Sequence, residues 1–221
     1  ELACAQGKKS KGGKALLNAV LAVSGAVVVM GAAQAQIAIG VQPVGVQGTA
    51  TATGVDTIAI GKNASATTFN TIAIGLGAVA SVQHGTASGD GAMATGESSF
   101  AGGYEAKASG LGSSAIGFQA VASGNSSNAT GYQAVASAAG ANASGANSVA
   151  SAISSNASGS GAKATALFSN ASGARALASG IRSNASGESA VASGDQSNAS
   201  GVSSVASGVQ SNASGYLAVA S

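Results

Sequence analysis

Alanine recurs along most of the chain with a fixed spacing. Every seventh residue from Ala52 to Ala220 is alanine, at 25 successive positions. The residue two places before each of these alanines is always small, being Ala, Ser, Thr or Gly from Thr57 onward. The residue two places after it is Gly at 19 of 24 positions, and the exceptions are Thr68, Val82, Ala138, Ala152 and Ala166. Such constant phase indicates an internal structural repeat rather than a low-complexity linker.

Strands fit this repeat better than helices do. A coiled coil also has a period of seven, but it needs large apolar side chains at two of every seven positions. Glycine in each heptad would further cost a helix about 1 kcal/mol per repeat. Strand alternation instead sends Ala190 and Ala192 to one face and Val191 and Ser193 to the other. Gly194 and the two residues after it then form a turn.

The full repeat is fourteen residues long, because alternate heptads differ. One lane carries Asn at a spacing of 14 from Asn128 to Asn212, and the other carries mostly Val from Val121 to Val219. One coil is therefore two short strands and two turns, and stacked coils form a parallel β-solenoid. Residues 50–221 make about 12 coils, which at a strand spacing of about 4.8 Å gives a rod roughly 60 Å long.

The inward positions of this roll hold only small side chains, so the two strands of a coil can pack closely. Representative interior residues are Ala59, Ala73, Ala122, Ala192 and Ala199. A buried Ala methyl contributes only about 0.8 kcal/mol, so a single roll is hard to stabilise alone. The same alternation turns four isoleucines outward, and oligomerisation is the natural way to cover them. They are Ile58, Ile60, Ile72 and Ile74.

Residues 1–35 have the order of a signal peptide that lacks its beginning. A basic segment, Lys8–Lys14, precedes an uncharged apolar run that ends in Ala33-Gln34-Ala35. This order predicts cleavage between Ala35 and Gln36. A transmembrane helix over the same run is the alternative, because the run is about long enough to span a bilayer.

The predicted mature chain has two parts. Residues 36–53 contain Pro43 and break the phase of the repeat, so we expect an irregular first coil or cap there. Residues 54–221 are the repeats, and the last of them is incomplete at Ser221. Cys4 is lost on cleavage, which excludes a disulfide-stabilised scaffold.

Composition and charge exclude several functions. Charged residues are 7% and aromatic residues 3% of the chain. From Gln36 onward there are five Lys or Arg and six Asp or Glu residues. This balance offers no basic patch or stacking platform for nucleic acid. Titratable side chains are too sparse for a catalytic site, and His84, the only histidine, has no partner ligands nearby in the sequence. We therefore expect no enzyme, no cofactor and no metal site.

Several segments resemble the YadA-like head of the trimeric autotransporter adhesins. The sequences TIAIG at 57–61 and NTIAIG at 70–75 are similar to one half of that family's coil. The sequences GDGAMATG at 89–96 and GFQAVASG at 117–124 are similar to the other half. Glu1-Leu2-Ala3 and the Lys, Gly and Ser run after it are similar to the end of the family's extended signal peptide.

The resemblance implies a left-handed parallel β-roll assembled as a homotrimer, with the strand that carries the four isoleucines at the trimer interface. It implies surface display on a Gram-negative bacterium, through a C-terminal outer-membrane barrel that would follow Ser221. It further implies adhesion to host extracellular matrix, a cell-surface receptor or other surfaces, together with autoaggregation.

One feature departs from the family pattern. The lane that holds Ile58 and Ile72 in the early coils holds Asn from Asn128 onward, while the large apolar residues move to the Val lane. Two interpretations stay open. The later trimer interface is an Asn and Ser ladder, or the later coils pack through another face.

The Asn lane also has a chemical interpretation. Its members start N-x-S/T sequons, as Asn63 and Asn125 do, which indicates either glycosylation or ladders of hydrogen bonds between coils. The aromatic residues stand in or near turns, where they can contact a ligand or cap adjacent coils. They are Tyr104, Tyr132, Tyr216, Phe118 and Phe168.

Two other functions fit parts of the pattern. An ice-binding β-solenoid is the alternative to an adhesin, because Ser or Thr follows each repeat alanine from Ser123 to Ser221. A carbohydrate-cleaving β-helix enzyme needs clustered carboxylates, and the six acids after Gln36 are scattered.

Overall fold

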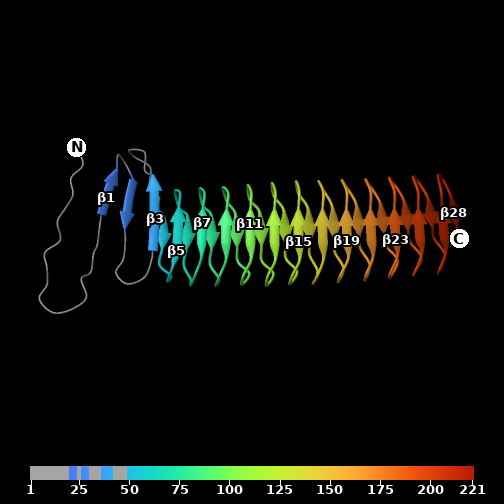
Figure 1. The fold of residues 1–221 in the computed structure, drawn as a ribbon, viewed down its shortest axis with the longest axis horizontal. Coiled ribbons are helices and arrows are strands. Elements are labelled where there is room, and N and C mark those ends of the chain that lie inside the picture. Colours follow the sequence, from blue (N-terminus) through green and yellow to red (C-terminus); the bar gives the residue numbers. More distant parts are fainter. Residues whose placement is uncertain (1–19, 24–25, 30–35, 42–48) are drawn as a thin grey trace, which may run out of the picture.

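The computed structural model describes residues 20–23, 26–29, 36–41 and 49–221. Within these ranges the chain consists of strands and turns with no helix. It winds into a rod of stacked coils, with β5 near one end and β28 at the other (Figure 1). Each coil from residue 49 onward gives one strand to each of two sheets, which we call the A sheet and the B sheet.

The A sheet has 15 strands. They are β1 (Val20–Val23), β2 (Ala26–Val29), β3 (Gln36–Val41), β5 (Thr57–Ile60), β7 (Ile72–Ile74), β9 (Thr86–Ser88), β11 (Phe100–Gly102), β13 (Ser114–Ile116), β15 (Asn128–Thr130), β17 (Asn142–Ser144), β19 (Asn156–Ser158), β21 (Asn170–Ser172), β23 (Asn184–Ser186), β25 (Asn198–Ser200) and β27 (Asn212–Ser214).

The B sheet has 13 shorter strands. They are β4 (Thr51–Ala52), β6 (Ser65–Ala66), β8 (Val79–Ala80), β10 (Met93–Ala94), β12 (Lys107–Ala108), β14 (Val121–Ala122), β16 (Val135–Ala136), β18 (Val149–Ala150), β20 (Lys163–Ala164), β22 (Leu177–Ala178), β24 (Val191–Ala192), β26 (Val205–Ala206) and β28 (Val219–Ala220).

Neighbouring strands are parallel and in register at one coil's spacing throughout the B sheet and from β5 onward in the A sheet. In the A sheet Ala185 pairs with Ala199, and in the B sheet Ala178 pairs with Ala192. Each repeat alanine therefore stacks on the alanine fourteen residues away, in its own sheet. The parallel β-solenoid with 14 residues per coil is confirmed, and its heptads are alternate strands of the A and B sheets.

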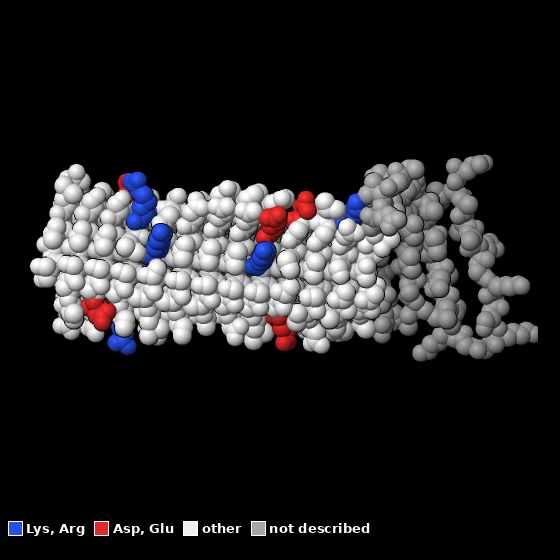
Figure 2. All heavy atoms as spheres, turned by 180° about the vertical axis from the view of Figure 1, so that it is seen from behind, with Lys and Arg blue, Asp and Glu red and all other residues white. Residues whose placement is uncertain are grey.

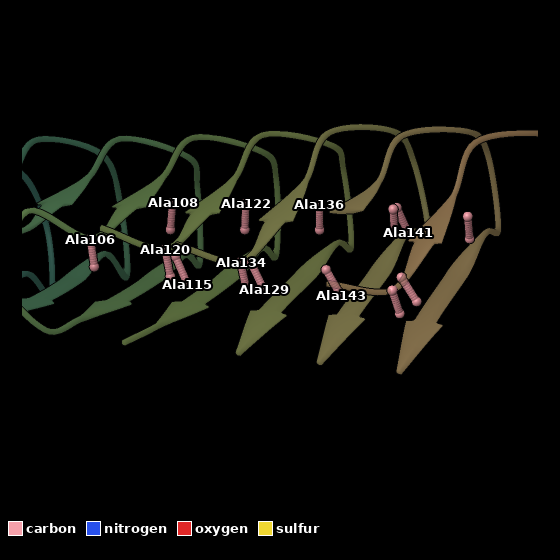
Figure 3. Packing of buried hydrophobic residues seen from close by; sticks show 14 of the residues in the cluster. Ala106, Ala108, Ala115, Ala120, Ala122, Ala129, Ala134, Ala136, Ala141 and Ala143 are labelled. Carbon is pink, nitrogen blue, oxygen red and sulfur yellow. The ribbon is translucent and has the colours of Figure 1, made fainter. Parts of the chain in front are cut away.

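The interior between the two sheets is built mainly from alanine methyl groups, with buried Ser and Thr side chains between them. Figure 3 shows alanines of successive coils pointing into the space that the two strands of each coil enclose. Ala59, Ala73, Ala122, Ala192 and Ala199, which we expected inside the roll, are each fully buried. The second inward position of each strand holds Ala, Ser, Thr or Gly. The largest fully buried side chain is therefore a threonine, represented by Thr57 and Thr71.

Two kinds of turn close each coil, and they explain where glycine is replaced. The turns that follow A-sheet strands from β5 onward, which we call A turns, begin with a glycine whose φ lies between +115° and +141°. L-residues rarely adopt this φ, and a Cβ on Gly187 would also meet the carbonyl oxygen of Gly201.

The turns that follow B-sheet strands, which we call B turns, begin with a residue of ordinary negative φ. All five exceptions to the glycine pattern are at this position. At Ala152 the backbone N–H donates to the hydroxyl oxygen of Ser155 at 3.2 Å, and that hydroxyl donates to the carbonyl oxygen of Ala152 at 2.6 Å. Positive φ therefore requires glycine at the opening of the A turns alone, although a Cβ on Gly180 or Gly194 in the B turns would also meet the carbonyl oxygen of the next coil.

The first coil is longer than the others. β3 pairs in parallel with β5, and Ala38 lies opposite Ala59, a spacing of 21 residues instead of 14. β4 then pairs with β6 at the usual spacing. The additional heptad thus lies between β3 and β4, in the part of the chain that we expected to be an irregular cap. β1 and β2 extend the A sheet beyond β3 in antiparallel fashion.

Candidate functional site

The outward side chains of the A sheet form the first candidate surface, which we call the A face. Ile58 and Ile60 alternate with the buried Thr57 and Ala59 along β5, and β7 repeats this arrangement. Ile58, Ile60 and Ile72 are half-buried by their neighbours within the chain, while Ile74 keeps 40% of its surface exposed. The structure thus places the four isoleucines together, pointing away from the interior.

The apolar part of the A face extends beyond the four isoleucines. Phe100 is 39% exposed and Ile116 is 43% exposed, and both lie in the same two columns as the isoleucines. The Phe100 ring lies over Gly102, since a Cβ added to Gly102 would come within 2.8 Å of that ring. The apolar part therefore covers the coils between Ile58 and Ile116, with a polar coil at Thr86 and Ser88.

From Asn128 onward the A face is polar, yet its columns continue without a shift. Asn128 pairs with Ser114 on one side and with Asn142 on the other, in the column that begins with Ile58. The change from isoleucine to asparagine is therefore a change of chemistry on one face. The A sheet itself does not change register.

From Asn142 to Asn212 the asparagines form a continuous hydrogen-bonded ladder. The Nδ2 of Asn142 donates to the Oδ1 of Asn156 at 3.2 Å, and the same bond follows at 2.8, 2.7, 2.7 and 3.0 Å as far as Asn212. Each inner amide uses one N–H and one oxygen lone pair in this way, and keeps one of each for another partner. This contact accounts for the Asn lane and favours the ladder over glycosylation.

A second candidate surface lies on the A turns, where three aromatic rings stack. The ring centroids of Tyr104 and Phe118 are 5.0 Å apart, and those of Phe118 and Tyr132 are 5.1 Å apart, with planes within 10°. Each ring comes from the first turn residue after the A-turn glycine in successive coils. These aromatics therefore cap adjacent coils, as one of our two interpretations expected, and they remain 40–51% exposed.

A column of polar side chains runs beside the rings. Gln133 donates to Gln119 at 2.9 Å, and Gln119 donates to Glu105 at 2.7 Å. The negative charge of Glu105 and its hydrogen bond, with a smaller contribution from Asp90, raise the pKa of the Tyr104 hydroxyl above its ordinary value. The spacing of 14 between the rings is visible in the sequence, but their stacking was not predicted.

A third surface, which the sequence analysis missed, lies on the B turns. In three successive coils the second residue of the B turn is a large apolar one. These residues are Ile153, Leu167 and Ile181, and they are 53%, 37% and 45% exposed. Phe168 is 50% exposed beside them, with the guanidinium of Arg182 6.0 Å from its ring centre. These residues make an apolar stripe on the edge of the rod.

The described residues carry few charged side chains. They contain no group of three His, Cys, Asp or Glu side chains that could hold a metal ion. His84 instead packs edge-on against the Phe69 ring, with centroids 5.8 Å apart. Figure 2 shows few, scattered charges on one side of the rod, and Arg175 pairs with Glu188 at 2.7 Å.

Two expectations concern the N-terminal region. Ala35 lies outside the described residues, and Gln36 is the first residue of β3. Within the part of the chain that the structure describes, no helix is both long and apolar enough to cross a membrane.

Comparison with known families gives matches along most of the solenoid. The model of the YadA head domain repeat matches more than half of the chain. The matched residues are 52–78, 69–92, 83–106, 94–120, 108–134, 171–197 and 199–220. The coils between residues 134 and 171 continue the same register, although their B turns begin with alanine.

The chain is also similar to a solved structure, the collagen-binding domain of the Yersinia adhesin YadA. The two share 24% identity over 76% of this chain and 66% of that domain, with a TM-score of 0.30. The chain therefore spans just under two thirds of that domain's length. No curated protein matches the sequence.

Proposed function

Because the chain belongs to the YadA-like heads of the trimeric autotransporter adhesins, we propose that it is displayed on the bacterial surface and attaches cells to host matrix, to host cells or to other surfaces. Autoaggregation is part of the same proposal. The observation that carries it is the apolar part of the A face, between Ile58 and Ile116, which a soluble monomer would rarely leave exposed.

In the assembled head, three copies turn their A faces toward one threefold axis. The isoleucines then fill the centre of the early coils, and the asparagine ladders fill the centre of the later coils. Each inner asparagine has one N–H and one lone pair left over for the other two copies, so a polar centre can be satisfied. This arrangement is the first of the two interpretations of the Asn lane.

The export and domain assignments belong to the same proposal. Residues 1–35 act as an extended signal peptide, cleavage after Ala35 leaves Gln36 as the new N-terminus, and an outer-membrane anchor lies beyond Ser221. Residues 36–53 cap the roll and 54–221 form the head. The strand β3, which pairs with β5, supports a cap that is continuous with the head.

The face left for a ligand in such a trimer is the outward side of the B sheet. It carries a column of mostly Val and a column of Ser or Thr, interrupted by the exposed Lys107 and Lys163. The similar Yersinia domain is described as collagen-binding, which makes collagen the first ligand to test. The partner is otherwise a host matrix protein or receptor.

The ice-binding alternative is less well supported. Its best evidence is the column of Ser and Thr on the B sheet, which the parallel register spaces evenly. Lys107, Lys163 and Met93 project from the same face as this column and interrupt the flat surface that an ice lattice requires.

The test is a double substitution on the A face. Ile58→Asp with Ile72→Asp introduces two carboxylates per copy beside the axis, so repulsion and desolvation should dissociate the trimer. The matched control for assembly is Val191→Asp with Val205→Asp, an outward pair on the B sheet. Because this sheet carries the proposed ligand face, the pair is a control for the oligomeric state alone. Analytical ultracentrifugation of the full chain should give a trimer for the unmutated protein and the control, and a monomer for the A-face variant.

Adhesion is measured on the unmutated protein and the A-face variant, with collagen-coated surfaces and with cell aggregation. Binding should fall together with the trimer in the A-face variant. A stable monomer for the unmutated chain would refute the assembly. Adhesion that survives complete dissociation would refute the link between assembly and function.

A further inference from the structure

The geometry of the proposed trimer determines which edges of neighbouring copies meet. This inference rests on the proposed function, because it assumes three copies with their A faces toward one axis. Each roll is flat and has the A turns along one edge and the B turns along the other. Three such rolls enclose a triangle, and at each corner the A turns of one copy meet the B turns of the next.

Threefold symmetry about an axis parallel to the rod also determines the height of each contact. Rotation about such an axis introduces no shift along it, so equal coils stand at equal heights. An A-turn residue of one copy therefore faces B-turn residues about half a coil earlier and later in its neighbour. Half a coil is about 2.4 Å along the rod.

The two edges are complementary in size where the B turns are apolar. Ile153, Leu167 and Ile181 project from three successive B turns with 37–53% of their surfaces exposed. The A turns at the same heights carry Ala146, Ser160 and Ala174, which are small residues. A large apolar side chain on one edge thus stands opposite a small residue on the other.

The relationship is reversed a few coils earlier. There the A turns carry the stacked rings, of which Phe118 and Tyr132 are 40% and 51% exposed. The B turns that flank Tyr132 in height carry Asn125 and Ala139, so space is available for the ring. Leu111, the B-turn residue between Tyr104 and Phe118 in height, is apolar and 51% exposed, which suits contact with aromatic rings.

Charge at the edges does not oppose this contact. Arg182 on the B turn stands less than half a coil from Glu188 on the A turn of the neighbouring copy. Within each copy Glu188 already binds Arg175, and Arg182 lies over Phe168. The corner therefore joins an acidic group with basic groups next to apolar side chains.

We propose that the B turns that carry Ile153, Leu167 and Ile181 pack against the A turns that carry Ala146, Ser160 and Ala174 of the next copy. This edge contact, repeated around the ring, adds to the isoleucine contact of the early coils by closing the trimer in the later coils, where the A face is polar. It explains why large apolar side chains stand exposed in the single chain at the coils whose A face has no isoleucine.

Cysteine pairs across the corner test the contact. Ser160→Cys with Leu167→Cys is made in the full chain with Cys4→Ser, so that only the new thiols are present. The two cysteines lie on opposite edges of one roll and cannot form a disulfide within a copy. Mild oxidation should therefore produce covalent dimers and trimers in denaturing gels, and neither single variant should produce them.

The cross-linking results distinguish a wrong edge contact from a wrong trimer. A trimer in ultracentrifugation without cross-links from the double variant overturns the edge contact and leaves the proposed function intact. Cross-links from Leu167→Cys alone show that like edges meet and also overturn it. A monomeric unmutated chain overturns both proposals.

A compensating pair of substitutions gives an independent readout that does not depend on oxidation. Ser160→Trp fills the space that Leu167 needs, so it should weaken trimerisation at least tenfold. Adding Leu167→Ala should restore it. Circular dichroism confirms that each variant keeps its strands, and failure of the second substitution to restore the trimer would contradict the contact.

Discussion

Replacing Ala192 by leucine is the most direct test of the alanine interior. Ala192 is fully buried and stacks in register between Ala178 and Ala206, which are fully buried as well. Leucine adds three carbon atoms that must enter the space between the sheets. The coils above and below are joined to this one by backbone hydrogen bonds, such as Val191 N–H to the oxygen of Ser204 at 2.8 Å, and cannot separate locally without breaking them.

The expected cost follows from overpacking in a site that cannot expand. Overpacking a core costs typically 1–3 kcal/mol, and we expect about 3 kcal/mol here because the buried side chains of the neighbouring strands are alanine and serine, which are too short to move aside. For a chain of this size about 1 kcal/mol lowers the melting temperature by roughly 2–4 °C, so Ala192→Leu should melt roughly 6–12 °C below the unmutated protein.

Val191→Leu is the matched control, because Val191 is adjacent, points outward and is half-buried. Its cost should stay below about 1 kcal/mol, since leucine can extend into solvent. Both variants are melted at equal protomer concentration, followed by circular dichroism, because association contributes to apparent stability. Equal melting temperatures for Ala192→Leu and Val191→Leu would refute the assignment of the interior.

Three further predictions concern the ladder, the A turns and export. Asn170→Ala removes two ladder bonds and should lower the free energy of unfolding by about 1–2 kcal/mol in denaturant titration, and an unchanged midpoint would contradict the ladder. Glu105→Gln should lower the pKa of Tyr104 toward its ordinary value, because the charge that opposes ionisation is gone. Ultraviolet titration, with Tyr104→Phe to identify the signal, measures this shift. N-terminal sequencing of surface-exposed protein should begin at Gln36, whereas retention of the apolar run 15–35 would favour a membrane anchor.

The fold was predictable because the repeated inward position has room only for an alanine side chain. A slot bounded by two backbones holds alanine at every coil, so its period appears directly in the sequence. Which heptads belong to the A sheet and which to the B sheet was harder to predict, since both strands of a coil have alanine at the repeat position. The replacements at Thr68 and Ala152 distinguish them, but only the φ of each turn glycine explains why they occur in B turns alone.

The candidate surfaces were only partly predictable, because outward positions obey no single rule. Alternation alone turned the isoleucines outward, and the Asn spacing suggested a ladder. The strand β3 was missed because the extra heptad before β4 hides its phase. The apolar B turns were missed because Ile153 and Ile181 lie in turns, where a large side chain is not diagnostic of any one structure.

The division between interior and surface also bears on how this head can vary without unfolding. Interior positions such as Ala129 and Ala185 are fully buried in coils whose outward residues differ widely. The backbone hydrogen bonds between coils do not depend on those outward residues either. Changes from isoleucine to asparagine on the A face, or from aromatic to small residues on the A turns, therefore leave the roll itself nearly unaltered. The specific chemistry of this chain therefore lies on its faces and edges, where a side chain can change without a change in the interior.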